Sequence, residues 1–143
     1  MPPSSHKPRA LGLLGEARAR AWLIGHGWTI AAANYRFGRR EVDVVARRGN
    51  LVAFVEVKAR GGVGYGAPED AVTHLKRREI EIVAREYLWR HRLDDVDVRF
   101  DVIAVTWVGG EARIAHIEDA WRPGSDTAVP TPRGRGRAQN GPR

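Results

Sequence analysis

Two residues of opposite charge interrupt the most apolar stretch of the chain. In the run Leu51–Lys58 (Leu-Val-Ala-Phe-Val-Glu-Val-Lys), Glu56 and Lys58 are two positions apart. Side chains of a strand alternate between its two faces, so this spacing places a carboxylate and an ammonium group on the same face. Asp43, in the preceding run Glu41–Ala46, lies across from this pair if the two runs form a simple hairpin. Burying these charges is costly unless they pair or bind an ion.

Hydrolysis of a phosphodiester needs this set of groups. Carboxylates hold Mg²⁺ or Mn²⁺, the metal polarises the phosphate and lowers the pKa of a bound water, and a nearby cation balances the charge of the transition state. Asp43 and Glu56 are candidate ligands, with the backbone carbonyl of Val57 as a further one. Lys58 would orient or deprotonate the water or stabilise the developing charge. A structural ion pair of Lys58 with either acid explains the same residues, and residue types alone leave both interpretations open.

Glu16 is a further acid on a partly apolar helical face. Its neighbours at helical spacing are Leu13, Ala19 and Leu23. A helix is predicted from Leu11 to about His26, because apolar residues recur there at helical spacing and glycines follow. The apolar stripe expected to face the core comprises Leu11, Leu14, Ala17, Ala21 and Ile24.

The remaining elements follow from apolar periodicity and turn residues. Three extended runs, Trp28–Phe37, Glu41–Ala46 and Leu51–Lys58, are joined by short polar turns that favour antiparallel hairpins, and the third reads as a central strand covered on both faces. A second helix is predicted from Pro68 to about His91, followed by strands over Asp97–Trp107 and Arg113–Ile117. The order helix, three strands, helix, two strands predicts a single α/β domain with a mixed sheet of about five strands and helices packed on it.

Composition sets limits on this domain. The chain has 143 residues and no cysteine, which excludes disulfide scaffolds, thiol nucleophiles and zinc sites built on thiolates. Its formal charge of +7 lies mostly in residues 1–10 and 122–143, which we expect to be disordered, whereas residues 11–121 carry +1. Without an 18-residue apolar run or a secretion signal, a cytoplasmic location and no membrane partner are expected.

Basic residues surround the candidate acids in the sequence. Between positions 36 and 60 there are seven basic and three acidic residues, so the local field favours a phosphate backbone. The residues expected to contact nucleic acid are Arg36, Arg40, Arg60, Tyr65 and Lys76, with Tyr65 able to stack on a base. Residues 62–67 match a dinucleotide fingerprint, but the region about 20 residues on, where a strand should end in an acid, is expected to be helical, so no nucleotide cofactor is expected.

Several short motifs, in order over about residues 11–121, resemble the YraN family. They are Gly15-Glu16-x-x-Ala19, Asn34-Tyr35-Arg36, Glu41-Val-Asp43-Val-Val, Phe54-Val-Glu56-Val-Lys58-x-Arg60, Lys76 and Arg99-Phe100-Asp101. That family is similar to the restriction-endonuclease-like superfamily with its PD-(D/E)xK motif, which includes archaeal Holliday junction resolvases. One departure is Arg40, where the family usually has glycine.

The resemblance implies a metal-dependent nuclease fold with a single domain. Asp43 and Glu56 then take the metal-ligand positions, Lys58 is the motif lysine and Glu16 is the helix acid near the metal. We expect an Mg²⁺- or Mn²⁺-dependent endonuclease that acts on DNA. Branched or flapped DNA, as it arises in recombination or repair, is the candidate substrate. Resolvase-like relatives act as dimers, which suggests a homodimer. The alternative is a non-catalytic DNA-binding or scaffolding protein that retains the nuclease fold.

Overall fold

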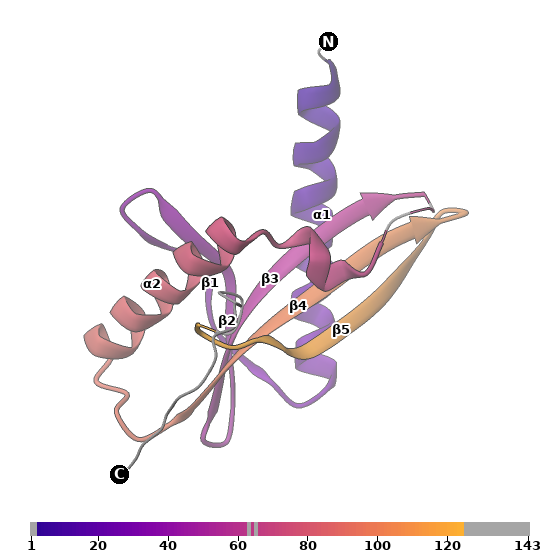
Figure 1. Ribbon diagram of the computed structural model, residues 1–143. Coiled ribbons are helices and arrows are strands. Elements are labelled where there is room, and N and C mark those ends of the chain that lie inside the picture. Colours follow the sequence, from indigo (N-terminus) through magenta and orange to yellow (C-terminus); the bar gives the residue numbers. More distant parts are fainter. Residues whose placement is uncertain (1–2, 63, 65, 125–143) are drawn as a thin grey trace, which may run out of the picture.

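The computed structural model describes residues 3–62, 64 and 66–124, and their element order is the predicted one (Figure 1). The elements are α1 (Pro3–Gly25), β1 (Thr29–Phe37), β2 (Arg40–Arg48), β3 (Leu51–Gly61), the 3₁₀ turn η1 (Pro68–Ala71), α2 (His74–Arg90), β4 (Asp97–Val108) and β5 (Glu111–Trp121). The chain therefore folds as an α/β domain with a single mixed sheet, in the order αβββαββ, as expected for the single-domain nuclease-like fold.

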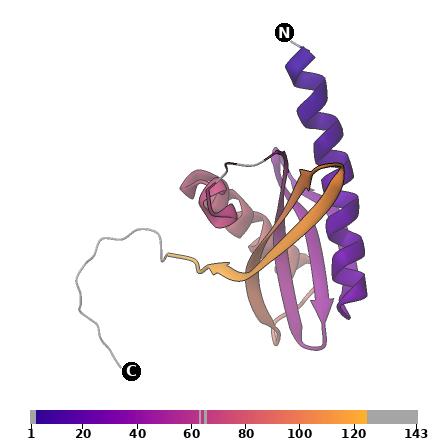
Figure 2. The ribbon, with the colours of Figure 1, turned by 90° about the vertical axis from the view of Figure 1, so that its right-hand side faces the viewer.

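The five strands lie in the order β1-β2-β3-β4-β5, so β3 is central as predicted. The pairs β1–β2, β2–β3 and β4–β5 are antiparallel, and β3 and β4 are parallel because α2 crosses over between them. The two helices cover opposite faces of the sheet, which Figure 2 shows edge-on. This three-layer arrangement buries β3 on both sides.

Two apolar clusters fill the spaces between the sheet and the helices. The cluster under α2 includes Phe54, Ile80 and Val83, and the cluster under α1 includes Val55 and Ile103, all of them fully buried. Successive residues of β3 thus pack in opposite apolar clusters. Glu56 and Lys58 share the face of Phe54, so the candidate acid and lysine lie on the α2 side.

The face that α1 turns to the sheet differs from the predicted stripe. Ala19 and Leu23 are fully buried, whereas Leu14 and Ile24 are 57% and 61% exposed. The reason is Gly15: a Cβ on this residue would lie 2.6 Å from the Cβ of Ala59, so only glycine allows α1 to approach β3 this closely. Close packing of small residues, and not the number of apolar ones, sets the rotation of the helix.

Both helices also begin at different residues from those predicted. Helix α1 starts at Pro3, well before Leu11, so residues 3–10, expected to be disordered, are helical. Extending a helix that is already packed costs little, and proline is well tolerated in a first turn. The predicted helix over residues 68–91 is split into η1 and α2, because the Thr73 hydroxyl accepts a hydrogen bond from the Lys76 N–H (3.1 Å) and caps a new helix.

The end of the chain adds one long strand. Strand β5 extends beyond the predicted range 113–117, and Trp121 closes the core at 4% exposure. Most of the predicted disordered tail, residues 125–143, lies outside the described residues. None of the helices in the described part is long and apolar enough to cross a membrane.

Candidate active site

The candidate site forms where β2 and β3 separate. Their last paired residues on this side are Val44 and Val55, so Asp43 and Glu56 come next to each other, which confirms the expected hairpin register. At this point the Asp43 carboxylate replaces a backbone acceptor: its Oδ2 accepts a hydrogen bond from the Val57 N–H at 2.8 Å. Asp43 is therefore held against β3, beside Glu56.

Glu56 is a buried acid without full hydrogen bonding. It is 4% exposed, and its Oε1 is buried with no hydrogen-bond partner among the described residues. Burial, followed by the charge of Asp43, raises the pKa of Glu56 to about 8. Burial also raises the pKa of Asp43, and the charge of Glu16 raises it further, whereas the hydrogen bond from the Val57 N–H lowers it. The nearby Asp43 carboxylate thus adds to the effect of burial on the pKa of Glu56.

Two lysines bring positive charge to this acid pair. Lys58 Nζ lies 3.8 Å from Glu56 Oε2, and its side chain is one-third exposed. The ion pair considered from sequence is thus present, but it is longer than a hydrogen bond and leaves Glu56 Oε1 unpaired. Lys76, in the first turn of α2, donates to the Glu41 carbonyl at 3.4 Å, and its charge lowers the pKa of both Asp43 and Glu56. The structure thus places Lys76 beside the start of β2, close enough for its charge to act on both acids, and its contact with phosphate stays a prediction.

Glu16 reaches the same region from α1, positioned by the close approach of Gly15. Its Oε1 accepts a hydrogen bond of 3.1 Å from the Asn34 Nδ2. Asn34 has a φ of +53°, a left-handed conformation that asparagine adopts more easily than most residues. Sequence reasoning gave Asn34 no role of its own, although an asparagine after three alanines in a strand pattern is a signal for such a conformation.

The acid pair fits a divalent cation through its unpaired oxygen. In the part of the chain that the structure describes, no three His, Cys, Asp or Glu side chains come together as a metal-binding group. The protein would therefore offer two carboxylates, Asp43 and Glu56, with water and the Val57 carbonyl to complete the ligands. Glu16 lies near enough for its charge to act on Asp43, and its direct coordination stays a prediction. Glu56 Oε1 is a buried acceptor that such an ion would satisfy.

The residues expected to contact nucleic acid have different positions. Arg36 is 68% exposed and lies 3.8 Å from Glu41, and Arg40 is exposed at the start of β2. Arg60 is half-buried near the end of β3, two residues after Lys58. Tyr65 lies outside the described residues. Arg40 and Arg60 thus lie on the same two strands as Asp43 and Glu56, and the contact of these arginines with DNA stays a prediction.

A second polar cluster lies on the other face of the sheet and holds the fold together. The buried carboxylate of Asp101 accepts two hydrogen bonds from Arg99 (2.9 Å each) and one from the Asp119 N–H (2.9 Å), and it lies 2.8 Å from His116 Nε2. Trp22 of α1 donates to the other ring nitrogen of His116 (3.3 Å), so the ring is held as the tautomer that donates to Asp101. The Arg99–Asp101 pair thus belongs to a buried polar network that joins β4 to β5 and α1.

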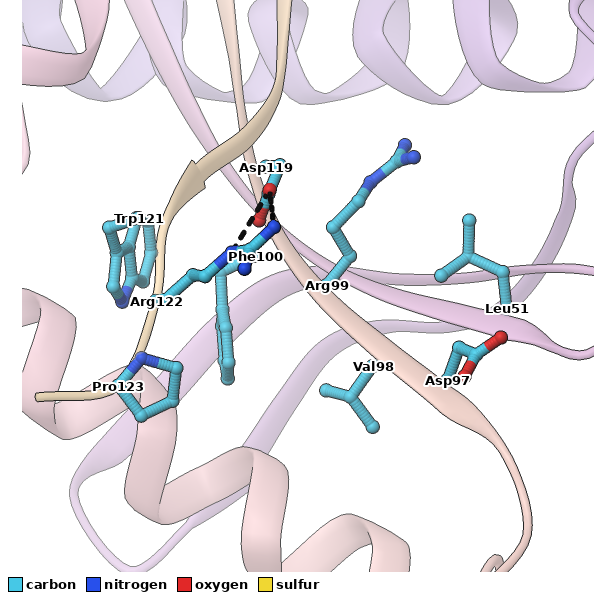
Figure 3. Close-up of a pocket in the computed structure, with 9 residues that line it drawn as sticks. All are labelled: Leu51, Asp97, Val98, Arg99, Phe100, Asp119, Trp121, Arg122 and Pro123. Carbon is cyan, nitrogen blue, oxygen red and sulfur yellow. Dashed lines mark hydrogen bonds and ion pairs between the residues drawn. The ribbon is translucent and has the colours of Figure 1, made fainter. Parts of the chain in front are cut away.

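The pocket shown in Figure 3 is remote from the acid pair. It has a volume of about 370 Å³ and lies at the opposite end of the parallel strands, by Leu51 and Asp97. Its lining is partly apolar and includes two acids, Asp97 and Asp119, of which Asp119 is paired with Arg122 at 2.8 Å. Figure 3 shows these two acids well apart, so they do not form a pair like that of Asp43 and Glu56.

Comparison with known proteins places the chain in a family. The family model described as "Uncharacterised protein family UPF0102" matches residues 15–105. The chain is 45% identical over 118 residues to a UPF0102 protein of Geobacter sulfurreducens, covering 82% of this chain and 92% of the relative. It is 42% identical over 120 residues to one from Anaeromyxobacter dehalogenans (81% and 90%) and 40% identical over 103 residues to one from Acetivibrio thermocellus (71% and 79%). The chain belongs to the UPF0102 family.

Proposed function

We propose that this protein is a metal-dependent endonuclease that hydrolyses phosphodiester bonds of DNA, with the restriction-endonuclease-like superfamily as its wider relationship. The observation that carries this proposal is the pair Asp43 and Glu56, with an unpaired buried oxygen on Glu56 and the Lys58 ammonium beside it. A protein that only binds phosphate gains nothing from two buried carboxylates, because they repel it. Their combination with lysines favours catalysis over binding alone.

Each residue of the site has a distinct role in this proposal. Asp43 and Glu56 hold Mg²⁺ or Mn²⁺, and Asp43 is kept in place by the Val57 N–H. The metal, when bound, supplies a water of lowered pKa and polarises the phosphate. Lys58, one-third exposed and 3.8 Å from Glu56, would stabilise the charge that develops on a phosphate bound at the metal. Lys76 limits the repulsion between the acids before the metal binds.

The surroundings of the site supply the expected attraction for DNA. Arg39 and Arg40 form the exposed end of the β1–β2 hairpin and make no side-chain hydrogen bond or ion pair among the described residues. Arg40 replaces the glycine usual in the family, and here it adds a free guanidinium three residues before Asp43. Such unpaired arginines attract a phosphate backbone without specifying its sequence.

The test is a cleavage assay on a panel of DNA structures. Purified protein is incubated with linear duplex, single-stranded, flapped and four-way DNA, in Mg²⁺, in Mn²⁺ and in chelator. The flapped and four-way forms are included because of the resemblance to resolvases. We expect metal-dependent cleavage that is lost in Asp43→Asn and Lys58→Ala. Cleavage that survives both substitutions would refute the site, and binding without cleavage of any substrate would favour a non-catalytic DNA-binding or scaffolding protein.

A further inference from the structure

An aromatic groove lies between the β1–β2 hairpin and the outer side of α2. Phe37 at the end of β1 is 41% exposed, and Trp89 in the last turn of α2 is 78% exposed. Together with Ile82, Arg85 and Glu86 they line a groove of about 360 Å³. A tryptophan this exposed is unusual, since its large apolar surface is normally covered. Its exposure could not be predicted from sequence, because tryptophans most often pack in or against a core.

The charges around this groove are positive. Glu86, the acid in its lining, accepts hydrogen bonds from the Tyr35 hydroxyl (2.6 Å) and from Arg90 Nε (2.7 Å), so its charge is already compensated. Arg85 makes no side-chain hydrogen bond or ion pair in the described part of the chain. Asp94 lies beyond Trp89, in a neighbouring hollow that also contains Arg90 and Arg92. The groove therefore combines flat aromatic rings with a rim in which guanidinium groups predominate.

The groove and the candidate active site lie along the same helix. Lys76, which donates to the Glu41 carbonyl and whose charge acts on the acid pair, is at the N-terminal end of α2, and Ile82 and Trp89 follow it on that helix. At 1.5 Å per residue, these two are about 9 Å and about 20 Å from Lys76 along the axis. Tyr35, two residues before Phe37, packs under α2 against Tyr87, so the groove opens on the α2 side of the sheet, as the acid pair does. At about 100° per residue, Trp89 also lies about 140° around the helix from Lys76, so a nucleic acid strand that joins the two sites passes around the outer side of α2 as well as along it.

We propose that the groove between Phe37 and Trp89 binds unpaired bases of a DNA strand whose backbone passes the Asp43–Glu56 pair. This inference rests on the proposed function and adds its substrate class: DNA with a single-stranded segment. Unpaired bases can stack on exposed aromatic rings, whereas bases in a duplex present only their edges. The arginine rim suits the accompanying phosphates, which favours a nucleic acid strand over a protein segment as the occupant.

The experiment measures binding alone, in chelator, so that no cleavage occurs. Fluorescence anisotropy of a labelled oligothymidine of about 12 nucleotides and of a blunt duplex is recorded with the full-length protein, Trp89→Ala, Phe37→Ala and Trp89→Phe. Leu75→Ala is the matched control, because Leu75 is a 72% exposed apolar residue on α2 that does not line the groove. We expect Trp89→Ala to weaken single-strand binding about 5- to 150-fold, as loss of one stacked base does, and to leave duplex binding unchanged. Trp89→Phe and Leu75→Ala should bind like the wild type.

The other outcomes separate this inference from the proposed function. Equal single-strand affinities for Trp89→Ala, Leu75→Ala and the wild type would overturn the groove but leave the acid pair as a nuclease site. A wild-type protein that does not bind the oligonucleotide would overturn the groove as a nucleic acid site and point to a protein partner for it. Conversely, Trp89-dependent binding without metal-dependent cleavage would support the groove and refute the endonuclease.

Discussion

Replacing Glu56 with glutamine should make the metal-free protein more stable at neutral and higher pH. The side chain is buried, and its environment raises its pKa to about 8 from an ordinary value of 4.5. Glutamine has nearly the same shape, stays neutral and adds a hydrogen-bond donor that can face the Asp43 carboxylate. The substitution therefore removes the charge penalty while it keeps the packing.

The sign and size of this effect follow from proton linkage. Between pH 4.5 and about 8 the folded protein keeps a proton that the unfolded chain releases, so the free energy of unfolding falls as the pH rises through this window. At about 1.4 kcal/mol per pKa unit, the whole shift corresponds to about 5 kcal/mol. Asp43 titrates together with Glu56, so part of this free energy belongs to the protonation of Asp43 and stays in the variant. We therefore expect Glu56→Gln to remove at least about 2 kcal/mol of the pH dependence of the unfolding free energy.

Urea unfolding, followed by tryptophan fluorescence in chelator at several pH values from 5 to 8.5, measures this directly. The wild type should lose stability across the range, and Glu56→Gln should lose less, so that the two curves diverge as the pH rises. Glu111→Gln, at an exposed position of β5, is the matched control and should follow the wild type. Parallel curves for the wild type and Glu56→Gln would refute the reasoning that a buried, uncompensated carboxyl lies at this site.

Three further predictions concern the packing of α1, the backbone of β1 and the polar cluster around Asp101. Gly15→Ala places a methyl group 2.6 Å from the Ala59 Cβ and should lower the free energy of unfolding, measured in urea, by about 1 to 3 kcal/mol. Gly12→Ala is the control and should not destabilise the protein, because a Cβ at Gly12 would have no neighbouring atom within 4 Å. Equal values for the two variants would contradict the close approach of α1 to β3. Asn34→Ala should cost about 1 kcal/mol because of the left-handed backbone, and Asn34→Gly should be the more stable of the two; the reverse order would contradict the strain. Asp101→Ala should cost about 3 kcal/mol, since it leaves buried donors without an acceptor. Burial alone would raise the pKa of Asp101, but its hydrogen bonds hold this pKa below 3.8. The stabilisation from these hydrogen bonds is therefore present above that pH and is lost as the pH falls through the lowered pKa. A free energy of unfolding that does not change with pH in this acid range would contradict this.

The sheet and the acid pair were predictable because they depend on local patterns. The apolar run of β3 identifies a central strand, and the short turn before it fixes the register that brings Asp43 to Glu56. Helix rotation was not predictable in this way. Helix α1 offers two apolar stripes, and the choice depends on the contact of Gly15 with Ala59, which are far apart in the sequence.

Features that depend on long-range contacts were missed for the same reason. Lys76 lies near the site because Thr73 begins a new helix close to the start of β2, whereas the sequence pattern predicts one continuous helix through this point. The hydrogen bond from Asn34 to Glu16 joins β1 to α1, and only the folded chain brings them together. The exposure of Trp89 likewise depends on which side of α2 meets the sheet.

Direct measurement of metal binding tests the central claim, that Asp43 and Glu56 form a divalent-cation site. Isothermal titration of the chelator-treated protein with Mn²⁺ should show binding in the wild type and in Glu111→Gln, and much weaker binding in Asp43→Asn and Glu56→Gln. Unfolding in the presence of Mn²⁺ provides the independent readout, since an ion that binds only the folded state raises its stability. Equal Mn²⁺ binding by the wild type and Glu56→Gln, or no binding by the wild type, would contradict the claim.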